Sequence, residues 1–351
     1  MATTVLVPFK TETNGNGTEI IKGEVRELTM KDLGITEADL EEFVRKNVSV
    51  LFPDEEETLL IVGQQVRNRE AGRADLVALD SNGNVVLIEL KRDRDDLVAR
   101  KEAFEFQAIR YAANYALIRT PQDLVQRLFA PYVERHRVEF EIQPDLKGLT
   151  SSELAARRVD AFLRDNNATG TFNQQQRIVL IASSFDLQTQ SACAWLAKSG
   201  IDIRCIAISP VEYAGQHFFQ AEQIIPPPSL DDFFVEVAEP TLAGSRPAPS
   251  AASRGRKYMP RMNQILEWSL VRPGDVLHIA ERESEKAEIV DADLVRFKGD
   301  EVSYNDWGQS VTGWSSINIY EWAVHEKTGA TLDELRRKRL EELEQQAVKG
   351  S

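Results

Sequence analysis

Three charged side chains lie at the ends of two neighbouring strand-like segments: one at the start of the first segment and two at the end of the second. The stretch VVLIELKR, residues 85–92, is apolar until Glu89 and Lys91. Because successive side chains of a strand alternate between faces, Glu89 and Lys91 share one face. Asp75 begins the preceding strand-like segment, and the hairpin between the two segments makes them neighbours. The sequence therefore predicts two carboxylates and one ammonium group at one end of a sheet.

These groups are the ones that metal-assisted chemistry on phosphates uses. Mg²⁺ binds through one or two carboxylates together with waters and substrate phosphate oxygens, which suits Asp75 and Glu89. Lys91 beside such a metal could hold or polarise the attacking water and offset the negative charge that builds on the phosphate. The structural alternative is an ordinary same-face ion pair between Glu89 and Lys91, with Asp75 a solvated strand end.

Two further polar side chains follow on a helical segment, residues 95–118. Gln107 and Tyr111 are spaced i, i+4 and therefore share a helix face. At the predicted site their amide and phenol could orient the lysine, the water or a DNA phosphate.

The elements that must position these residues can be read from the hydrophobic pattern. Apolar runs predict strands, the Asn-Gly of SNGN predicts a tight hairpin, and 3.6-residue periodicity predicts helices. The predicted strands are residues 59–66, 74–80, 85–90, 177–184 and 201–209, and the predicted helices include 36–47, 121–136 and 190–200. The later strand–helix–strand unit favours an extension of the first sheet. We therefore expect an α/β protein with a mixed central sheet flanked by helices.

The domain organisation follows from length and from one shift in composition. A chain of 351 residues favours two domains. Residues 239–257 are rich in Pro, Ala, Ser and Gly and lack periodicity, as an interdomain linker does. We expect one domain over residues 1–238, with its core at about 36–225, and a small α+β domain over 258–351.

Composition excludes several functional classes. A net charge of −14 argues against a protein that coats nucleic acid non-specifically, although Arg92 and Arg94 are candidates for a local basic face, with solvated surface charge as the alternative. Two cysteines and four scattered histidines provide neither a disulfide framework nor a cysteine-built zinc site. No stretch approaches the roughly 18 apolar residues of a membrane helix, and the N-terminus lacks a secretory signal. We expect a cytoplasmic protein with no membrane partner.

The order of these motifs resembles the PD-(D/E)xK nuclease superfamily, especially the branch with NucS-like and RecB-like endonuclease domains. Its D, ExK and QxxxY elements are similar to Asp75, Glu89-Leu90-Lys91 and Gln107 to Tyr111. The resemblance implies a restriction-endonuclease-like core in which the acid pair binds Mg²⁺ or Mn²⁺, the lysine assists the water, and the glutamine and tyrosine support the site or contact substrate. It also implies a metal-binding glutamate on the preceding helix, which Glu41 matches better than Glu42 does.

One position departs from this family pattern. Ala74 stands where the family has a proline before the first motif aspartate.

The C-terminal part resembles the RAMA domain of restriction enzymes and adenine methylases. The likeness rests on LVRPGDVLHI, FKGDEVSY and SVTGWSSINIYEW followed by GATLDELR. It implies recognition of DNA, with modified bases as one target. Trp307 and Trp314 could then stack on a base, whereas the alternative places them in the core of a small domain.

These observations predict a metal-dependent DNA endonuclease, acting in restriction or phage defence, with a C-terminal module that reads DNA. A catalytically silent DNA-binding or scaffold protein on the same fold remains an alternative, as does a nuclease directed at RNA, because the site residues contact only phosphates. Concerted cutting of both strands needs two active sites, so we expect a homodimer.

Overall fold

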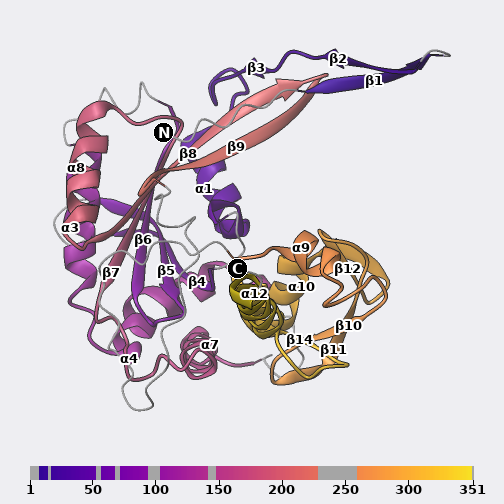
Figure 1. The fold of residues 1–351 in the computed structure, drawn as a ribbon. Coiled ribbons are helices and arrows are strands. Elements are labelled where there is room, and N and C mark those ends of the chain that lie inside the picture. The colour runs from indigo at the N-terminus through magenta and orange to yellow at the C-terminus, as the bar shows by residue number, and fades with distance from the viewer. Residues whose placement is uncertain are drawn as a thin grey trace.

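The computed structural model describes residues 8–14, 17–52, 57–67, 72–93, 103–140, 148–227 and 259–349. A large sheet with helices on both sides forms the N-terminal module, residues 8–227, and a second, smaller sheet forms the C-terminal module, residues 259–349. A long ribbon of strands projects from the large sheet (Figure 1). The predicted linker 239–257 lies outside the described residues.

The large sheet has seven strands, mixed in direction. They are β3 (Arg26–Glu27), β4 (Leu59–Arg67), β5 (Arg73–Asp80), β6 (Val85–Lys91), β7 (Gln176–Ala182), β8 (Asp202–Tyr213) and β9 (Gln216–Ile225), in the order β3-β8-β7-β6-β5-β4 with β9 paired to β8. Strands β4, β5 and β6 are antiparallel, whereas β6–β7 and β7–β8 are parallel. A separate hairpin joins β1 (Phe9–Asn14) to β2 (Gly17–Lys22).

The predicted tight turn connects β5 to β6. Asp80 Oδ1 accepts hydrogen bonds from the backbone N–H groups of Asn82 (3.0 Å) and Asn84 (2.8 Å). Gly83 has a φ of +81°, which a glycine adopts without steric cost. Every residue of β6 from Val85 to Leu90 is buried, as expected for a central strand that is covered on both faces.

Helices cover both sides of this sheet. They are α1 (Glu37–Lys46), α3 (Phe104–Tyr115), α4 (Pro121–Leu124), α5 (Ala130–Arg135), α6 (Arg137–Phe140), α7 (Ser151–Asp165) and α8 (Leu187–Lys198), with a 3₁₀ turn η1 (Val48–Leu51) and a π-helical turn η2 (Val125–Phe129). Figure 1 shows α3 and α8 on one side of the sheet and α1 on the other. The expected fold class, a mixed central sheet flanked by helices, is confirmed.

One predicted helix begins as the sequence indicates, and two others differ from the prediction in extent or geometry. Thr36 caps α1 in a capping box with Asp39, as the sequence indicates. Within the predicted helix 95–118, α3 covers Phe104–Tyr115, and residues 94–102 lie outside the described residues. The predicted helix 121–136 is continuous but contains the π-helical turn η2, which periodicity does not reveal.

The C-terminal module is an α+β unit, as expected. Its five antiparallel strands are β10 (Val276–Ile279), β11 (Arg282–Ile289), β12 (Leu294–Phe297), β13 (Asp300–Ser303) and β14 (Ala323–His325), in the order β13-β12-β11-β10-β14. Its helices are α9 (Met262–Glu267), α10 (Tyr304–Thr312), α11 (Ile319–Trp322) and α12 (Leu332–Lys349). Thr331 and Glu334 form the predicted capping box of α12, with backbone-to-side-chain distances of 2.8 and 3.1 Å.

The C-terminal module packs against the edge of the large sheet. The carbonyl of Leu59, in β4, accepts hydrogen bonds from the N–H groups of Ser315 (2.8 Å) and Ser316 (3.1 Å). The ring of Trp314 packs edge-on against Phe162 of α7, with centroids 5.3 Å apart. An uncovered edge strand would present unpaired backbone groups, so this contact protects the start of β4.

Candidate active site

The predicted carboxylates lie where the pairing of β5 and β6 stops. The last paired residues are Leu76 and Ile88. Beyond this pair, Asp75 Oδ2 accepts a hydrogen bond from the backbone N–H of Leu90 at 2.8 Å. Asp75 is 6% exposed and Glu89 is 0% exposed. The alternative of a solvated strand end at Asp75 is therefore wrong, since both carboxylates are buried side by side.

Glu89 is a buried acid with an unused acceptor. Its Oε2 accepts a long hydrogen bond of 3.4 Å from Gln107 Nε2, while its Oε1 has no hydrogen-bond partner among the described residues. Burial, together with the negative charge of Asp75, raises the pKa of Glu89 to about 9. Burial also raises the pKa of Asp75, to about 6, although Lys91 and the Leu90 N–H oppose it. This arrangement favours a positively charged ligand between the two acids.

Lys91 does not pair with Glu89. Its Nζ lies 3.0 Å from Glu37 Oε1 and donates a hydrogen bond to the carbonyl of Leu90 at 2.8 Å. Burial lowers the pKa of Lys91, but the charges of Asp75 and Glu37 outweigh it, so the pKa lies above the usual value. The lysine is therefore a protonated, largely buried ammonium beside the carboxylates. The ordinary Glu89–Lys91 ion pair that the sequence left open is absent.

Helix α1 brings a third carboxylate to the site. Gln65 Nε2 donates one hydrogen bond to Glu41 and another to Asp75 Oδ1, the latter at 3.2 Å. Glu41 is 4% exposed, and burial raises its pKa in spite of the Gln65 bond. Glu42 faces away and pairs with Arg45 at 2.7 Å. The helix phase therefore places Glu41, rather than Glu42, beside Asp75, and the role of Glu41 as a metal ligand stays a prediction.

Gln107 and Tyr111 lie together on α3, as their spacing predicts. Gln107 Nε2 is 3.4 Å from the Tyr111 hydroxyl as well as from Glu89. The Tyr111 hydroxyl also lies against Gly72, where an added Cβ would come within 1.8 Å of it. Gly72 has a φ of +115°, a backbone conformation that residues other than glycine rarely adopt. Gln107 therefore orients Glu89, and the absence of a side chain at Gly72 leaves room for the Tyr111 hydroxyl.

The donor atoms at this site suit a hard divalent cation. The available ligands are carboxylate oxygens, and the unpartnered Glu89 Oε1 is the acceptor that a cation would satisfy. Among the described residues, no group of three or more His, Cys, Asp or Glu side chains is arranged to hold a metal ion by itself. A cation held by Asp75 and Glu89 would therefore need waters or phosphate oxygens as further ligands, and Glu41 could join only if the Gln65 amide moved.

The residues predicted to bind nucleic acid are not brought together. Arg92 is half-buried and pairs with Asp93 at 2.9 Å, and Arg94 lies outside the described residues. Trp307 is 0% exposed and Trp314 is 5% exposed. The expectation that these two tryptophans stack on a base is not supported, because Trp307 is fully buried and Trp314 packs against Phe162 of α7 and against Trp322.

Comparison with known proteins adds little to this geometry. No protein-family model matches the chain, and no curated protein sequence matches it. Among solved structures, it is similar to the structure described as an EndoMS–dsDNA2 complex, with 16% sequence identity over 57% of this chain and a TM-score of 0.22. The chain spans 65% of that protein's length. At this TM-score the likeness does not bear on function.

No described helix is both long enough and apolar enough to span a lipid bilayer.

Three residues of the site were not predicted from the sequence. Glu37 lies four residues before Glu41 on α1, and this i, i+4 spacing is the signal that could have placed both on one face. Gln65 belongs to a pair of glutamines that breaks the apolar run of β4, and its φ of +50° is rare for a residue other than glycine. Gly72 carried no signal, since its role depends on contact with Tyr111 from a distant helix.

The buried Glu89 should make the metal-free protein less stable as pH rises. The pKa of Glu89 is about 9 in the folded protein and has its ordinary value of 4.5 in the unfolded chain. Between pH 4.5 and pH 9, therefore, the unfolded chain has lost a proton that the folded protein still holds. The free energy of unfolding should therefore fall by about 1.4 kcal/mol per pH unit from this group between those values. Glu89→Gln should remove this loss and be more stable than the wild type at pH 8 in EDTA.

Urea unfolding of both proteins in EDTA at pH 5.5 and pH 8 measures the effect. An advantage of Glu89→Gln that does not grow with pH would contradict the raised pKa.

Proposed function

We propose that this protein is a Mg²⁺- or Mn²⁺-dependent nuclease that hydrolyses the phosphodiester bonds of DNA. The observation that carries the proposal is the buried pair Asp75 and Glu89, with a protonated Lys91 beside it and a Glu89 oxygen that has no hydrogen-bond partner among the described residues. Burying two acids next to each other costs stability in the absence of a cation, so a bound cation accounts for the arrangement.

In this proposal the metal ligands and Lys91 have different roles. A bound divalent cation would polarise a phosphate oxygen and lower the pKa of a water molecule. Asp75 and Glu89 would hold it, and because ligands must be deprotonated, Glu89 would release its proton on binding. Lys91 would donate hydrogen bonds to the attacking water or to the phosphate, where it offsets the developing negative charge. Water adds to phosphorus, one P–O ester bond breaks, and the leaving oxygen takes up a proton.

Other side chains would act through these groups. Gln107 keeps the Glu89 carboxylate in place, and Glu37 keeps the Lys91 ammonium close to the carbonyl of Leu90. Both are therefore positioning residues in this proposal. Glu41 would become a further ligand when the Gln65 amide leaves it.

Two alternatives and two finer predictions remain. A silent DNA-binding or scaffold protein would not need Asp75, Glu89 and Lys91 intact, and all three are present. A nuclease directed at RNA would use the same phosphate chemistry. A role in restriction or phage defence, and a homodimer for cutting both strands, are predictions that the present geometry neither favours nor opposes.

The proposal is tested by incubating end-labelled DNA and RNA of matched sequence with the full-length protein in Mg²⁺ or in EDTA. We expect cleavage of DNA in Mg²⁺ and none in EDTA. Cleavage of RNA alone would select the RNA-directed alternative, and DNA binding without any cleavage would select the silent protein.

A further inference from the structure

A cavity of about 520 Å³ lies between the N-terminal and C-terminal modules. It is bounded by the ends of α1 and α6, one face of α7, the start of β4, and the segment from α10 to the residues that pair with β4. We call it the interdomain cleft. A volume of this size accommodates a small ligand or part of a chain.

The lining of the interdomain cleft is basic in an acidic protein. Five basic side chains line it, against the single carboxylate of Glu139; the five are Arg45, Lys46, Arg157, Arg158 and Arg282. The whole chain has the opposite balance, with 42 lysines and arginines against 56 aspartates and glutamates. Clefts lined by one sign of charge concentrate ligands of the opposite sign, so this one favours an anion.

Three of the five basic groups are already neutralised. Arg45 pairs with Glu42 (2.7 Å) and Glu139 (2.9 Å), and Lys46 pairs with Glu42 at 3.2 Å. Arg282 pairs with Asp165, whose side chain is 4% exposed, at 2.7 Å. These pairs build the wall of the cleft and leave the positive charge to the two arginines of α7.

Arg157 and Arg158 form no ion pair with any described residue. Arg157 is exposed, with the charge of Glu153 near it on α7. Arg158 is partly buried, and its Nη1 donates hydrogen bonds to the carbonyls of Thr312 (3.4 Å) and Gly313 (3.1 Å). Burial lowers the pKa of Arg158, as expected for a guanidinium without a carboxylate partner. Arginine presents a planar set of donors that matches phosphate oxygens. The exposed guanidinium of Arg157 and the Nε and Nη2 donors of Arg158 therefore favour a phosphate ligand in the cleft.

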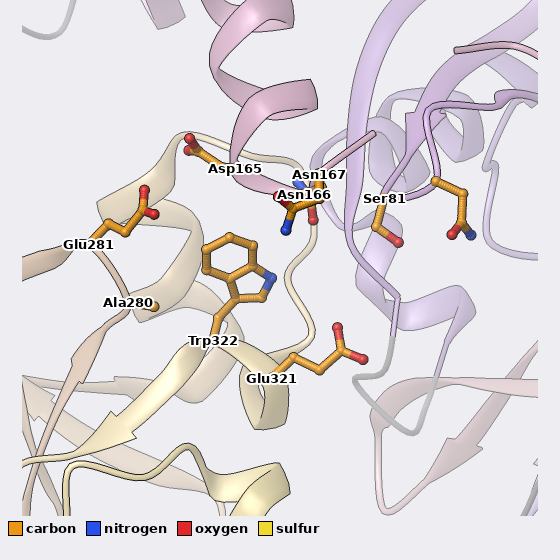
Figure 2. Close-up of a pocket in the computed structure, with 9 residues that line it drawn as sticks. Ser81, Asp165, Asn166, Asn167, Ala280, Glu281, Glu321 and Trp322 are labelled. Carbon is orange, nitrogen blue, oxygen red and sulfur yellow. The ribbon is translucent and has the colours of Figure 1, made fainter. Parts of the chain in front are cut away.

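A second cavity at the same interface has the opposite character. Figure 2 shows its lining, with the ring of Trp322 between Glu321, Glu281 and the end of α7 at Asp165. It is lined by carboxylates and asparagines and has no basic side chain. The positive charge is therefore a property of the interdomain cleft and not of the whole interface, and a phosphate would be repelled from the second cavity.

Helix α1 connects the interdomain cleft to the candidate active site. Glu41 faces the carboxylates, and Lys46, five residues later, lines the cleft. At 1.5 Å per residue the two are separated by roughly 7.5 Å along the helix axis. One helix therefore contributes side chains both to the carboxylate site and to the wall of the cleft.

We propose that the interdomain cleft binds backbone phosphates of the nucleic-acid substrate, through Arg157 and Arg158. The ligand class rests on the proposed function, but binding in the cleft does not require cleavage. The C-terminal module then contributes to substrate binding by forming one wall of the cleft, without any exposed tryptophan.

The test is the salt dependence of DNA binding by the full-length protein in EDTA. EDTA removes the divalent cation, so the measurement reports binding whether or not the protein cleaves DNA. Fluorescence anisotropy of a labelled duplex gives the slope of log affinity against log salt concentration. For Arg157→Gln we expect weaker binding to every sequence and a slope reduced by about 0.9, the value for one lost phosphate contact. Arg157→Gln/Arg158→Gln should reduce it by about 1.8.

Matched controls separate this result from a general loss of charge or of folding. Arg119→Gln removes the same charge from an exposed arginine outside the cleft, and it should leave the slope unchanged. Arg157 has no hydrogen bond to another residue that the structure describes, so Arg157→Gln should melt like the wild type, whereas Arg158→Gln loses its bonds to Thr312 and Gly313.

Two outcomes would overturn the proposal. One is an Arg157→Gln slope equal to that of the wild type. The other is binding of adenosine monophosphate that Arg157→Gln abolishes without any change in duplex binding, which would assign the cleft to a small phosphate ligand.

Discussion

Replacing Asp75 or Glu89 by alanine should abolish Mg²⁺-dependent cleavage, with a loss of at least about a thousandfold in turnover, since the metal contributes several kcal/mol to stabilising the transition state. The fold should persist in EDTA. Removing either acid relieves the repulsion between two buried neighbours, of which Glu89 is 0% exposed. The measurements are single-turnover cleavage of labelled DNA and thermal melting of each variant.

A matched control is Glu42→Ala. Glu42 lies next to Glu41 on α1 but pairs with Arg45, so its replacement should leave the chemical step unchanged even if stability falls. Full activity in Asp75→Ala or Glu89→Ala would show that the site has been misassigned.

Replacing Lys91 by alanine should slow the chemical step by about 10²- to 10³-fold, as the loss of one preorganised donor does. Affinity for DNA should change little, because one lysine is a small part of the phosphate contacts of a nucleic-acid-binding protein. Single-turnover rates at saturating enzyme, together with binding measured in EDTA, separate the two effects.

Glu37→Gln provides the control for Lys91. It keeps the ammonium but removes its ion pair, which is 3.0 Å long, so the rate should fall much less than in Lys91→Ala. Equal losses of binding and turnover in Lys91→Ala would instead make Lys91 a simple phosphate clamp.

The central strands and the relation of Asp75 to Glu89 could be predicted from the sequence because both depend on local signals. A two-residue period places Glu89 on a known face of β6, and the Asn-Gly turn fixes the register that brings Asp75 beside it. The spacing of Gln107 and Tyr111 likewise fixes their shared face on α3. These are properties of a few consecutive residues.

What the sequence could not predict depends on contacts between distant segments. The pairing of Ser316 with Leu59 joins residues more than 250 positions apart, and it creates the interdomain cleft. The partner of Lys91 was also open, because Glu37 lies on a different element, α1, and its 3.0 Å contact with Lys91 depends on how α1 packs on the sheet. For Trp314, the aromatic composition allowed a core or a surface role, and packing on Phe162 decided it.

The most direct measurement is anomalous diffraction from crystals soaked in Mn²⁺ at a concentration that supports cleavage. The proposed site predicts a peak within about 2.0–2.6 Å of carboxylate oxygens of both Asp75 and Glu89, the range of hard-cation ligand distances. It also predicts that Glu89→Gln crystals lose this peak. A cleavage-competent protein with its Mn²⁺ bound elsewhere, or an unchanged peak in Glu89→Gln, would contradict the assignment of these two carboxylates as the metal centre.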